Sequence, residues 1–533
     1  DKMAAIVTDQ FRILNAGNFV DSVTDTSNSY YVFVGLSNPN GGGYGKKTNL
    51  KWDTETPNPT DNFDYYGFVG DNMSFGKKVT SANVRRLARR INWARGTKYE
   101  MYRHDYSLEN KSPVTGSSRL YDANYYVMNS DYKVYICIDN GSSGISTTGN
   151  ASLNEPTFTD LEPTKAGDGS DGYTWKYLFS VSPNDIIKFD STDYISLPAN
   201  WGTSTDAQVT SVRNNGDSDV NDNQIKKVYI ADRGKGYSQG SWELNIIGDG
   251  SDGKVVVDVN SSGYITNAVV SSGGKGYSFG MVDLGPIRSV GVGASNATLI
   301  PVIPPSKGHG SDIYTELGAD KVLVYARFDD STRDFPTDTK FGQIGIVKNP
   351  TTIGTASSVF LQNQFSSIGA FKFSSVNGET STKPEIGQRI TQVTAEGTAQ
   401  GYVSSYDRET KVLKYTQDRT LYLNPTTNDN VDHAGISTTG NVLSFFTSDP
   451  ASGSTVNNII SSDGVTGTID RNFSGINTNP SGNKLISLGL EFSDGIASPE
   501  INKGSGDIIY IDNRPEITRN SRQKEDVKII LEF

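Results

Sequence analysis

Short runs of apolar and aromatic residues, bounded by turn-forming residues, recur along the whole chain. β-Branched and aromatic residues in runs of this length are typical of β-strands, because they pack well on a pleated, half-buried surface. The clearest runs are residues 30–36, 132–139, 321–328 and 527–533. The pattern therefore predicts a mainly β chain of many short strands joined by polar turns.

Helical periodicity is scarce and predicts few, short helices. The best candidate, 81–93, has four apolar residues at helical spacing: Val84, Leu87, Ala88 and Ile91. Ser81 could cap the N-terminus of this helix. A shorter helix is predicted after "GHGSD", where Ser311 or Asp312 could cap the N-terminus and Gly318 could end the helix.

One pattern occurs twice. "IKKVYIADRGKGYSQG" aligns with "ITNAVVSSGGKGYSFG" at a constant offset of 40 residues, so that Tyr237 matches Tyr277. Each copy predicts a strand, a glycine turn, an anchoring tyrosine and a second strand. Two copies are too few for a solenoid. They predict a small β-sandwich or barrel with pseudo-twofold symmetry at about 205–303, ended by the proline-rich "PVIPPSKG".

The glycine–lysine turn of this pattern shares only its residue types with a phosphate-binding loop. A Walker-type loop requires Lys followed by Ser or Thr, between a strand and a helix. Here Gly-Tyr-Ser follows the lysine, and the next residues have the pattern of another strand. We therefore expect tight turns, in which glycine permits a positive φ, and no nucleotide site.

The charge balance argues against a nucleic-acid partner. Forty-nine Lys and Arg stand against 60 Asp and Glu, which gives a net charge of −11. Binding of nucleic acid requires clustered basic residues that neutralise phosphates. We expect the arginine-rich stretch at 85–95 to face solvent or a protein partner.

Cys137 is the only cysteine and lies in an apolar run, which predicts a buried, unreactive thiol and no intrachain disulfide. No stretch approaches the ~20 apolar residues that span a bilayer, and nothing resembles a signal peptide. We therefore expect a soluble protein made in a cytoplasm, without membrane insertion. Asp1 and Lys2, before Met3, are typical of a cleaved tag and are left out of the fold prediction.

The histidines predict no metal site. His104, His309 and His433 stand far apart, each without a neighbouring His or Cys at ligand spacing. His309 lies near Asp312 in a glycine-rich stretch, but no Gly-x-Ser-x-Gly elbow supplies a hydrolase nucleophile. We expect His309 to form part of a turn.

Acidic residues offer no clearer chemistry. "GDGSDG" begins at Gly167 and again at Gly248, but neither copy has the spacing of an EF-hand, so Asp-Gly turns are the expected structure and adventitious calcium stays open. Two carboxylates for glycoside hydrolysis must lie close in the fold, and no pair stands out among the 60 acidic residues. We expect no enzyme, resident metal, cofactor or small-molecule substrate.

Several segments carry a family resemblance in their order and spacing. "AAIVTDQFR", "RRINWARGTKYEMYRHDY" and "DGYTWKYLFSV" precede a closing "GDIIYIDNRPEITRNSRQKEDVKIILEF". The chain resembles the baseplate wedge subunit family known as gene product eight in T-even-like contractile-tailed bacteriophages. The closing pattern matches at Ile509, Tyr510, Asp512, Asn513, Arg514, Pro515 and Phe533. A second signature matches at Asp171, Gly172, Tyr173, Trp175, Tyr177, Leu178 and Phe179.

The resemblance covers roughly half of the chain and implies its division into segments. It extends over about residues 3–200, 304–350 and 498–533. The family core is then expected at 3–204, 304–350 and 498–533, with an inserted β-module at 205–303 and a second β-rich insertion at 351–497. What the insertions contact does not follow from the family pattern.

The resemblance also implies a function. Members of this family form homodimers with a layered β-sandwich core, are built into the wedges of the virion baseplate and bind neighbouring wedge proteins. The expected role is mechanical, because rigid β-modules hold partners in register until sheath contraction is triggered. An alternative from another class is a carbohydrate-binding or depolymerising tail protein, suggested by the Tyr-rich β-modules and the many carboxylates.

The large side chains of the matched segments have two candidate roles. For Trp93, Trp175 and Tyr177 we expect core packing, because large aromatic residues anchor sheets. The matched arginines are Arg89, Arg90 and Arg514. For each of them, an ion pair inside the subunit is at least as well supported as a contact with a partner. No binding residue is assigned from the sequence.

Overall fold

The computed structural model describes residues 8–36, 56, 58–215, 224–289, 293–329, 340–355, 357–378, 384–386, 388–394, 397–417, 422–423, 430–431, 445, 458–461, 464–482, 484–518 and 523–533. The chain is mainly β, with several separate sheets and, within these residues, five α-helices. This confirms the predicted fold class. No helix in the described part is both long and apolar enough to cross a membrane.

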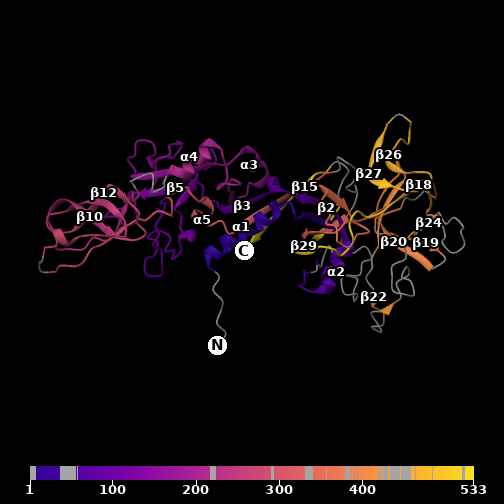
Figure 1. The fold of residues 1–533 in the computed structure, drawn as a ribbon, viewed down its shortest axis with the longest axis horizontal. Helices are drawn as coiled ribbons and strands as arrows, with labels where there is room; N and C mark the ends of the chain where they lie inside the picture. Colours follow the sequence, from indigo (N-terminus) through magenta and orange to yellow (C-terminus); the bar gives the residue numbers. More distant parts are fainter. Residues whose placement is uncertain are drawn as a thin grey trace. The chain divides into compact units, whose positions relative to one another are not determined.

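The chain forms two compact units. The first comprises Asp1–Val20, Val84–Val324 and Ile530–Phe533, and the second comprises Asp21–Asn83 and Tyr325–Ile529. Figure 1 shows the elements of each. The predicted division into a family core and two insertions stays a prediction.

One sheet of the first unit carries the aromatic signature residues. Its strands run in the order β4-β5-β7-β6. Their bounds are Tyr126–Met128 (β4), Lys133–Asn140 (β5), Thr164–Lys165 (β6) and Tyr173–Ser180 (β7). Cys137 on β5 lies opposite Trp175 and is fully buried. Burial raises the pKa of its thiol, as expected for an unreactive cysteine.

A second sheet in this unit has the order β30-β15-β3-β8. Its strands are β3 (Val84–Arg89), β8 (Tyr194–Ser196), β15 (Lys321–Phe328) and β30 (Glu525–Glu532), and β15 and β30 also contain residues of the second unit. Ala88 and Ile195 from this sheet share one apolar cluster with the β4–β7 sheet. The helices are α1 (Asp9–Thr24), α3 (Pro183–Phe189), α4 (Ala207–Asn215) and α5 (Ile313–Glu316).

The helix predicted at 81–93 is wrong. Only Ser81–Asn83 are helical, as a single 3₁₀ turn, and the next residues form β3. β3 lies between two partners, because Leu87 is opposite Lys321 on β15 and Ser196 on β8. Long-range pairing in the middle of a sheet therefore overrides the local helical spacing.

The second predicted helix is confirmed as α5. The Asp312 carboxylate accepts hydrogen bonds from the N–H groups of Tyr314 and Thr315 at 3.0 and 3.3 Å, which caps the helix. Gly318, just after the helix, has a φ of +67°. The predicted N-terminal cap at Asp312 and the predicted helix end at Gly318 are thus both confirmed.

Six strands of the first unit close around a core of their own. They are β9 (Val228–Asp232), β10 (Gly240–Gly248), β11 (Ser251–Val259), β12 (Ile265–Lys275), β13 (Gly280–Val282) and β14 (Thr298–Pro301). Hydrogen bonds join β12-β11-β10-β13 and β14-β9, while β13 also lies against β14 and β12 against β9. The buried residues inside all lie between Ile225 and Ile303. We call these strands the barrel (Figure 1).

The two copies of the repeated pattern interlock in the barrel. β9 of the first copy pairs with β14 of the second, and β12 of the second pairs with β11 of the first. β10 and β13, which follow the two turns, pair with each other. The turn glycines have matching φ angles: +55° and +57° for Gly234 and Gly274, +91° and +75° for Gly236 and Gly276. The glycine–lysine stretch of the first copy lies between β9 and β10, as predicted, whereas in the second copy Gly274 and Lys275 are the last residues of β12 and the chain turns after them.

The barrel is bonded to the rest of the first unit. Lys227, at its start, places its Nζ 2.8 Å from Asp139 Oδ2 and donates to the Ser142 carbonyl at 3.1 Å. The N–H of Ile303, at its end, donates to His104 Nδ1 at 3.2 Å. The stretch 207–215 forms α4, whose Val212 is buried in the cluster of the two sheets.

The second unit contains a five-stranded sheet in the order β17-β2-β1-β16-β29. Its elements are β1 (Tyr30–Gly35), β2 (Met73–Val79), β16 (Lys340–Lys348), β17 (Gln364–Ser366), β29 (Asp507–Thr518) and the neighbouring α2 (Phe63–Asn72). Tyr31 and Phe33 on β1 and Tyr65 on α2 are buried in one cluster. β1 confirms the strand predicted at 30–36.

A seven-stranded sheet completes the second unit, in the order β21-β20-β19-β24-β25-β18-β28. Its strands are β18 (Gly369–Asn377), β19 (Arg389–Thr394), β20 (Gly397–Asp407), β21 (Val412–Thr416), β24 (Asn458–Ser461), β25 (Thr466–Ile469) and β28 (Ile496–Ala497). Two further pairs are β22 (Tyr422–Leu423) with β23 (Asn430–Val431), and β26 (Gly475–Thr478) with β27 (Ile486–Phe492). This unit has two more apolar clusters, one around Phe371 and one around Leu490.

Candidate functional site

The signature residues around β7 stabilise the core. The buried Asp171 carboxylate accepts hydrogen bonds from the N–H groups of Leu153 and Asn154 at 2.8 and 3.2 Å, and from that of Tyr173 at 3.1 Å. Trp175 and Tyr177 are buried, and Trp93 packs against the same cluster. This confirms the expected core packing of the three aromatics.

The three arginines of the matched segments differ in their partners. Arg90 Nη1 lies 2.6 Å from Asp190 Oδ1, and Arg514 Nε lies 2.6 Å from Asp512 Oδ2, so both form ion pairs inside the chain. Arg89 has no carboxylate partner in the described part of the chain. Its Nη2 donates to the Ala123 carbonyl at 2.7 Å.

His309 is a buried member of a polar pair. Its Nδ1 lies 2.5 Å from Glu316 Oε1, while Glu316 Oε2 accepts from the Gly310 N–H at 2.7 Å. Its ring and that of Tyr102 are nearly perpendicular, with ring centroids 4.7 Å apart. His309 thus lies in a glycine turn, as predicted, but no sequence pattern indicated that its partner is Glu316. Asp312, the acid considered for it, caps α5 instead.

His104 lies in a different environment from that of His309. Burial lowers the pKa of His104, whose Nδ1 accepts the Ile303 N–H. His433 and the second "GISTTGN" stretch at 435–441 lie outside the described residues. Within the described ranges, no group of three or more His, Cys, Asp or Glu residues could hold a metal ion.

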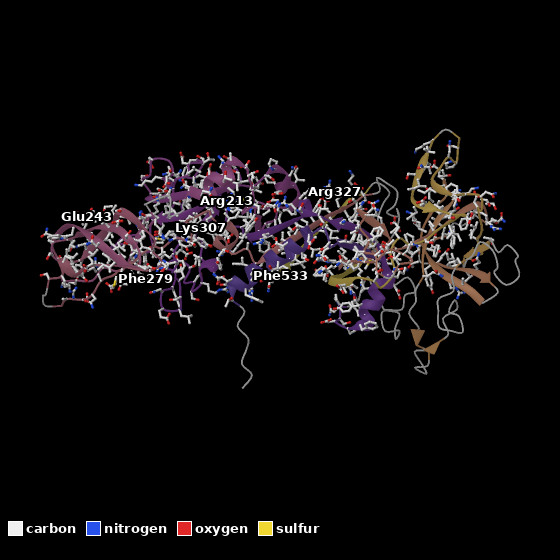
Figure 2. The ribbon with its side chains drawn as sticks, viewed as in Figure 1. Arg213, Glu243, Phe279, Lys307, Arg327 and Phe533 are labelled. Atoms are coloured by element: carbon white, nitrogen blue, oxygen red, sulfur yellow. The ribbon has the colours of Figure 1, made fainter. Side chains whose placement is uncertain are left out.

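The "GDGSDG" stretches use their carboxylates to hold turns. Asp168 Oδ1 accepts from the Ser170 N–H at 3.0 Å. In the second stretch, Asp249 Oδ1 accepts from the N–H groups of Ser278 and Phe279 at 2.9 and 3.2 Å. Phe279 itself lies on the surface of the barrel, with 63% of its area exposed (Figure 2). These contacts confirm the predicted turns.

Replacing Asp249 by asparagine should loosen the turn between β12 and β13 in a pH-dependent way. The Ser278 hydroxyl and the two N–H groups lower the pKa of Asp249 from 3.8 to about 2. A lowered folded-state pKa contributes stability that is present above pH 3.8 and is lost as the pH falls through about 2. Hydrogen exchange of the Ser278 and Phe279 amides in the full chain should be faster in Asp249→Asn at pH 7.

The difference between Asp249→Asn and the wild type should shrink as the pH falls below about 4 and vanish only well below pH 2, where both side chains are neutral. Asp258→Asn is the matched control on the same barrel, because its carboxylate meets only a 3.4 Å contact from Asn267. Equal exchange of the Asp249→Asn variant and the wild type at pH 7 would show that the carboxylate does not hold this turn.

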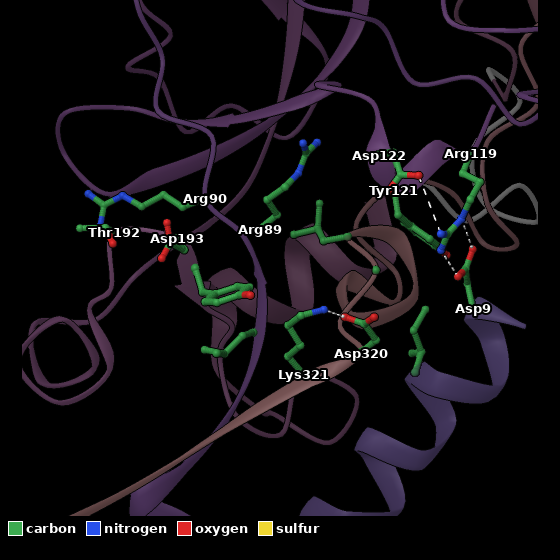
Figure 3. Close-up of a pocket in the computed structure, with 15 residues that line it drawn as sticks. Asp9, Arg89, Arg90, Arg119, Tyr121, Asp122, Thr192, Asp193, Asp320 and Lys321 are labelled. Atoms are coloured by element: carbon green, nitrogen blue, oxygen red, sulfur yellow. Dashed lines mark hydrogen bonds and ion pairs between the residues drawn. The ribbon is translucent and has the colours of Figure 1, made fainter. Parts of the chain in front are cut away.

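A pocket of about 420 Å³ lies in the first unit. Five segments line it: the first turn of α1, the end of β3, the η2 turn (Leu120–Asp122), the start of β8 and the connection from α5 to β15 (Figure 3). Its apolar lining comes from Ile13, Leu87 and Leu317, each at most 5% exposed. Apart from Thr192 and Gly318, the remaining lining is charged or aromatic.

Most of the charged groups in this pocket neutralise one another. Arg119 forms ion pairs with Asp9 and, at 3.8 Å, with Asp122. Lys321 Nζ lies 2.9 Å from Asp320 Oδ1 and 3.2 Å from Glu532 Oε1. Burial acts to lower the pKa of Lys321, but these two carboxylates raise it overall. Figure 3 shows the pairs within the pocket as dashed lines.

Two groups lining the pocket are left unmatched. One is Arg89, which donates to the Ala123 carbonyl and also interacts with the Tyr126 hydroxyl, but has no carboxylate partner in the described part of the chain. The other is Asp193, whose backbone carbonyl accepts from the Arg90 N–H at 2.8 Å but whose carboxylate has no partner among the residues that the structure describes. Their backbones are neighbours, because Arg89 is opposite Tyr194 in the β3–β8 pair. The pocket therefore offers one available cation and one available anion.

We compared the chain with known protein families and with curated proteins. No known protein family matches the chain, and no curated protein matches its sequence.

Proposed function

We propose that the chain is a structural component of a phage tail baseplate wedge, which binds neighbouring wedge proteins during assembly and during the triggering of sheath contraction. The resemblance carried by the ordered segments, above all the closing "IYIDNRP" stretch and the "DGYTWKYLF" signature, is the observation on which the proposal rests. A homodimer within the virion baseplate, made in the host cytoplasm, is part of the same proposal.

The placement of these segments supports a scaffolding role. The "DGYTWKYLF" signature supplies core residues and a buried carboxylate that binds a loop. The closing segment forms β29 and β30, which are the outermost strands of two different sheets. Outermost strands offer unpaired backbone groups to a partner chain, which suits a protein whose role is to join others.

Purified protein should behave as a dimer and bind its neighbours. Light scattering should give a mass twice the 57.7 kDa of one chain, and the protein should co-purify with the wedge proteins of its own phage. Obligate assembly interfaces are large and apolar, so the dimer should persist at high salt. A strict monomer that ignores those wedge proteins would contradict the proposal.

The carbohydrate-binding or depolymerising alternative has a separate test. A glycan array and a degradation assay with host envelope polysaccharide should both be silent for a wedge component. Specific glycan binding or polysaccharide cleavage would favour the alternative.

A further inference from the structure

We propose that the pocket beside α1 binds a peptide segment of a partner protein that carries one acidic and one basic side chain. Arg89 takes the carboxylate of the segment, and Asp193 takes its cation. The proposal rests on the proposed function only in expecting that the partner is a protein.

Arg89 is suited to a carboxylate. It is the last residue of β3, is solvent-exposed, uses one N–H group on the Ala123 carbonyl and also interacts with the Tyr126 hydroxyl. The guanidinium has five N–H donors in a planar fork, which matches a carboxylate through two parallel hydrogen bonds. Its remaining donors face no acidic group in the described chain, in contrast to Arg90 and Arg119.

The surrounding charges select a ligand that is neutral overall. The pocket lining contains four basic residues (Arg89, Arg90, Arg119 and Lys321) and four acidic residues (Asp9, Asp122, Asp193 and Asp320). The chain as a whole carries a net charge of −11. Because the lining charges balance, a polyanion such as nucleic acid, or a phosphate dianion, gains no net attraction from the lining and is disfavoured by the negative charge of the chain. A segment with one charge of each sign meets Arg89 and Asp193 without that disadvantage.

The size and lining of the pocket fit a short piece of chain. Its volume of about 420 Å³ lies within the range of known ligand pockets, roughly 300–1,000 Å³. Leu87 and Leu317 are 0% and 2% exposed and are covered by other side chains, so the methylene groups of Glu and Lys side chains pack instead against the two partly exposed tyrosines of the lining. Tyr121 and Tyr194 add aromatic surface beside the charged groups.

Short peptides provide a direct test on the full chain. The probes are acetyl-Glu-Ala-Lys-amide and the reversed acetyl-Lys-Ala-Glu-amide, each with two analogues in which Gln replaces either Glu or Lys. Binding is titrated by saturation-transfer NMR. The better of the two parent peptides should bind about tenfold more tightly than either of its analogues, because each analogue loses one charge-assisted contact.

Variants assign each contact to its residue. Arg89→Gln should abolish the preference for Glu over Gln and keep the preference for Lys, whereas Asp193→Asn should do the reverse. Arg89→Lys, which keeps the charge and loses the fork, should fall between the wild type and Arg89→Gln. Arg514→Gln, an exposed arginine of the second unit, is the control and should change nothing. Unaltered thermal unfolding should accompany each variant.

Several outcomes would overturn the proposal. These are no binding of either parent peptide, equal affinity for parents and analogues, an unchanged Glu preference in Arg89→Gln, or competition by inorganic phosphate at lower concentration than the parent peptide. If peptides do not bind while wedge proteins still co-purify, the pocket proposal fails and the proposed function stands. If peptides bind as expected while wedge proteins do not, the proposed function fails alone.

Discussion

Replacing Glu316 by alanine should destabilise the first unit by about 3–5 kcal/mol, which is the usual cost of breaking a buried polar pair from one side. Glu316 is 3% exposed, and its two carboxylate oxygens meet His309 Nδ1 and the Gly310 N–H. Alanine leaves both groups buried without a partner and opens a cavity. Hydrogen exchange of β5 and β7 amides in the full chain measures the loss.

Two variants separate the buried pair from the helix that carries it. Glu316→Gln keeps an oxygen for the Gly310 N–H and an amide group beside His309, so it should cost about 1–2 kcal/mol. Asp312→Ala removes the exposed cap of the same short helix and should cost about 1 kcal/mol. If Glu316→Ala cost no more than Asp312→Ala, the pair would have no special role in the core.

A strand of this chain could be predicted where a run of apolar residues extends over the whole strand. β15 matches the predicted 321–328 in full, because β-branched and aromatic residues fill it between turn residues. The prediction failed at 84–89, where strand pairing with residues more than 100 positions away decides the structure. α1 was missed because its sequence lacks a clear apolar periodicity. Its buried positions include Ala16 and Gly17, which carry almost no hydrophobic signal.

The pocket could not be predicted, because it is assembled by the fold from five separate segments. The sequence showed a cluster of arginines at 85–95 but could not tell which of them would meet an acid. In the structure, Arg85 pairs with Asp185 and Arg90 with Asp190, each 100 positions along the chain. Arg89 has no carboxylate partner in the described part of the chain. Whether an arginine meets an acidic residue depends on the fold, so the sequence around Arg89 could not predict this.

The turns of the barrel were predicted because their requirement is local. Glycine at positive φ costs little, whereas an L-residue there costs roughly 1–2 kcal/mol, so Gly-Lys-Gly before an apolar residue indicates a turn without knowledge of the fold. The pairing of strands from one copy with strands from the other could not be predicted. The same sequence pattern is compatible with pairing within each copy and with pairing between the copies.

Replacing Gly274 by alanine should destabilise the barrel by about 3 kcal/mol, whereas Gly276→Ala should cost about 1–2 kcal/mol. Both glycines have positive φ, +57° and +75°, so the backbone strain is similar. The difference is space. A Cβ on Gly274 would lie 2.3 Å from the Ser251 carbonyl oxygen and 2.6 Å from the Gly253 nitrogen, both backbone atoms of β11. A Cβ on Gly276 would meet no atom closer than Gly250 Cα at 3.9 Å.

The duplication supplies the matched control. Gly234 is the counterpart of Gly274 in the first copy, and a Cβ on it would lie 2.5 Å from the Ala297 nitrogen. Gly234→Ala should therefore destabilise the barrel about as much as Gly274→Ala, with the loss seen in amide exchange of β9 and β14 as well as β11 and β12, because one core is shared by both copies. Loss confined to the strands of one copy would mean that the halves open independently.

Equal costs for Gly274→Ala and Gly276→Ala would show that backbone strain, and not the close approach of β11, is what requires glycine at these turns.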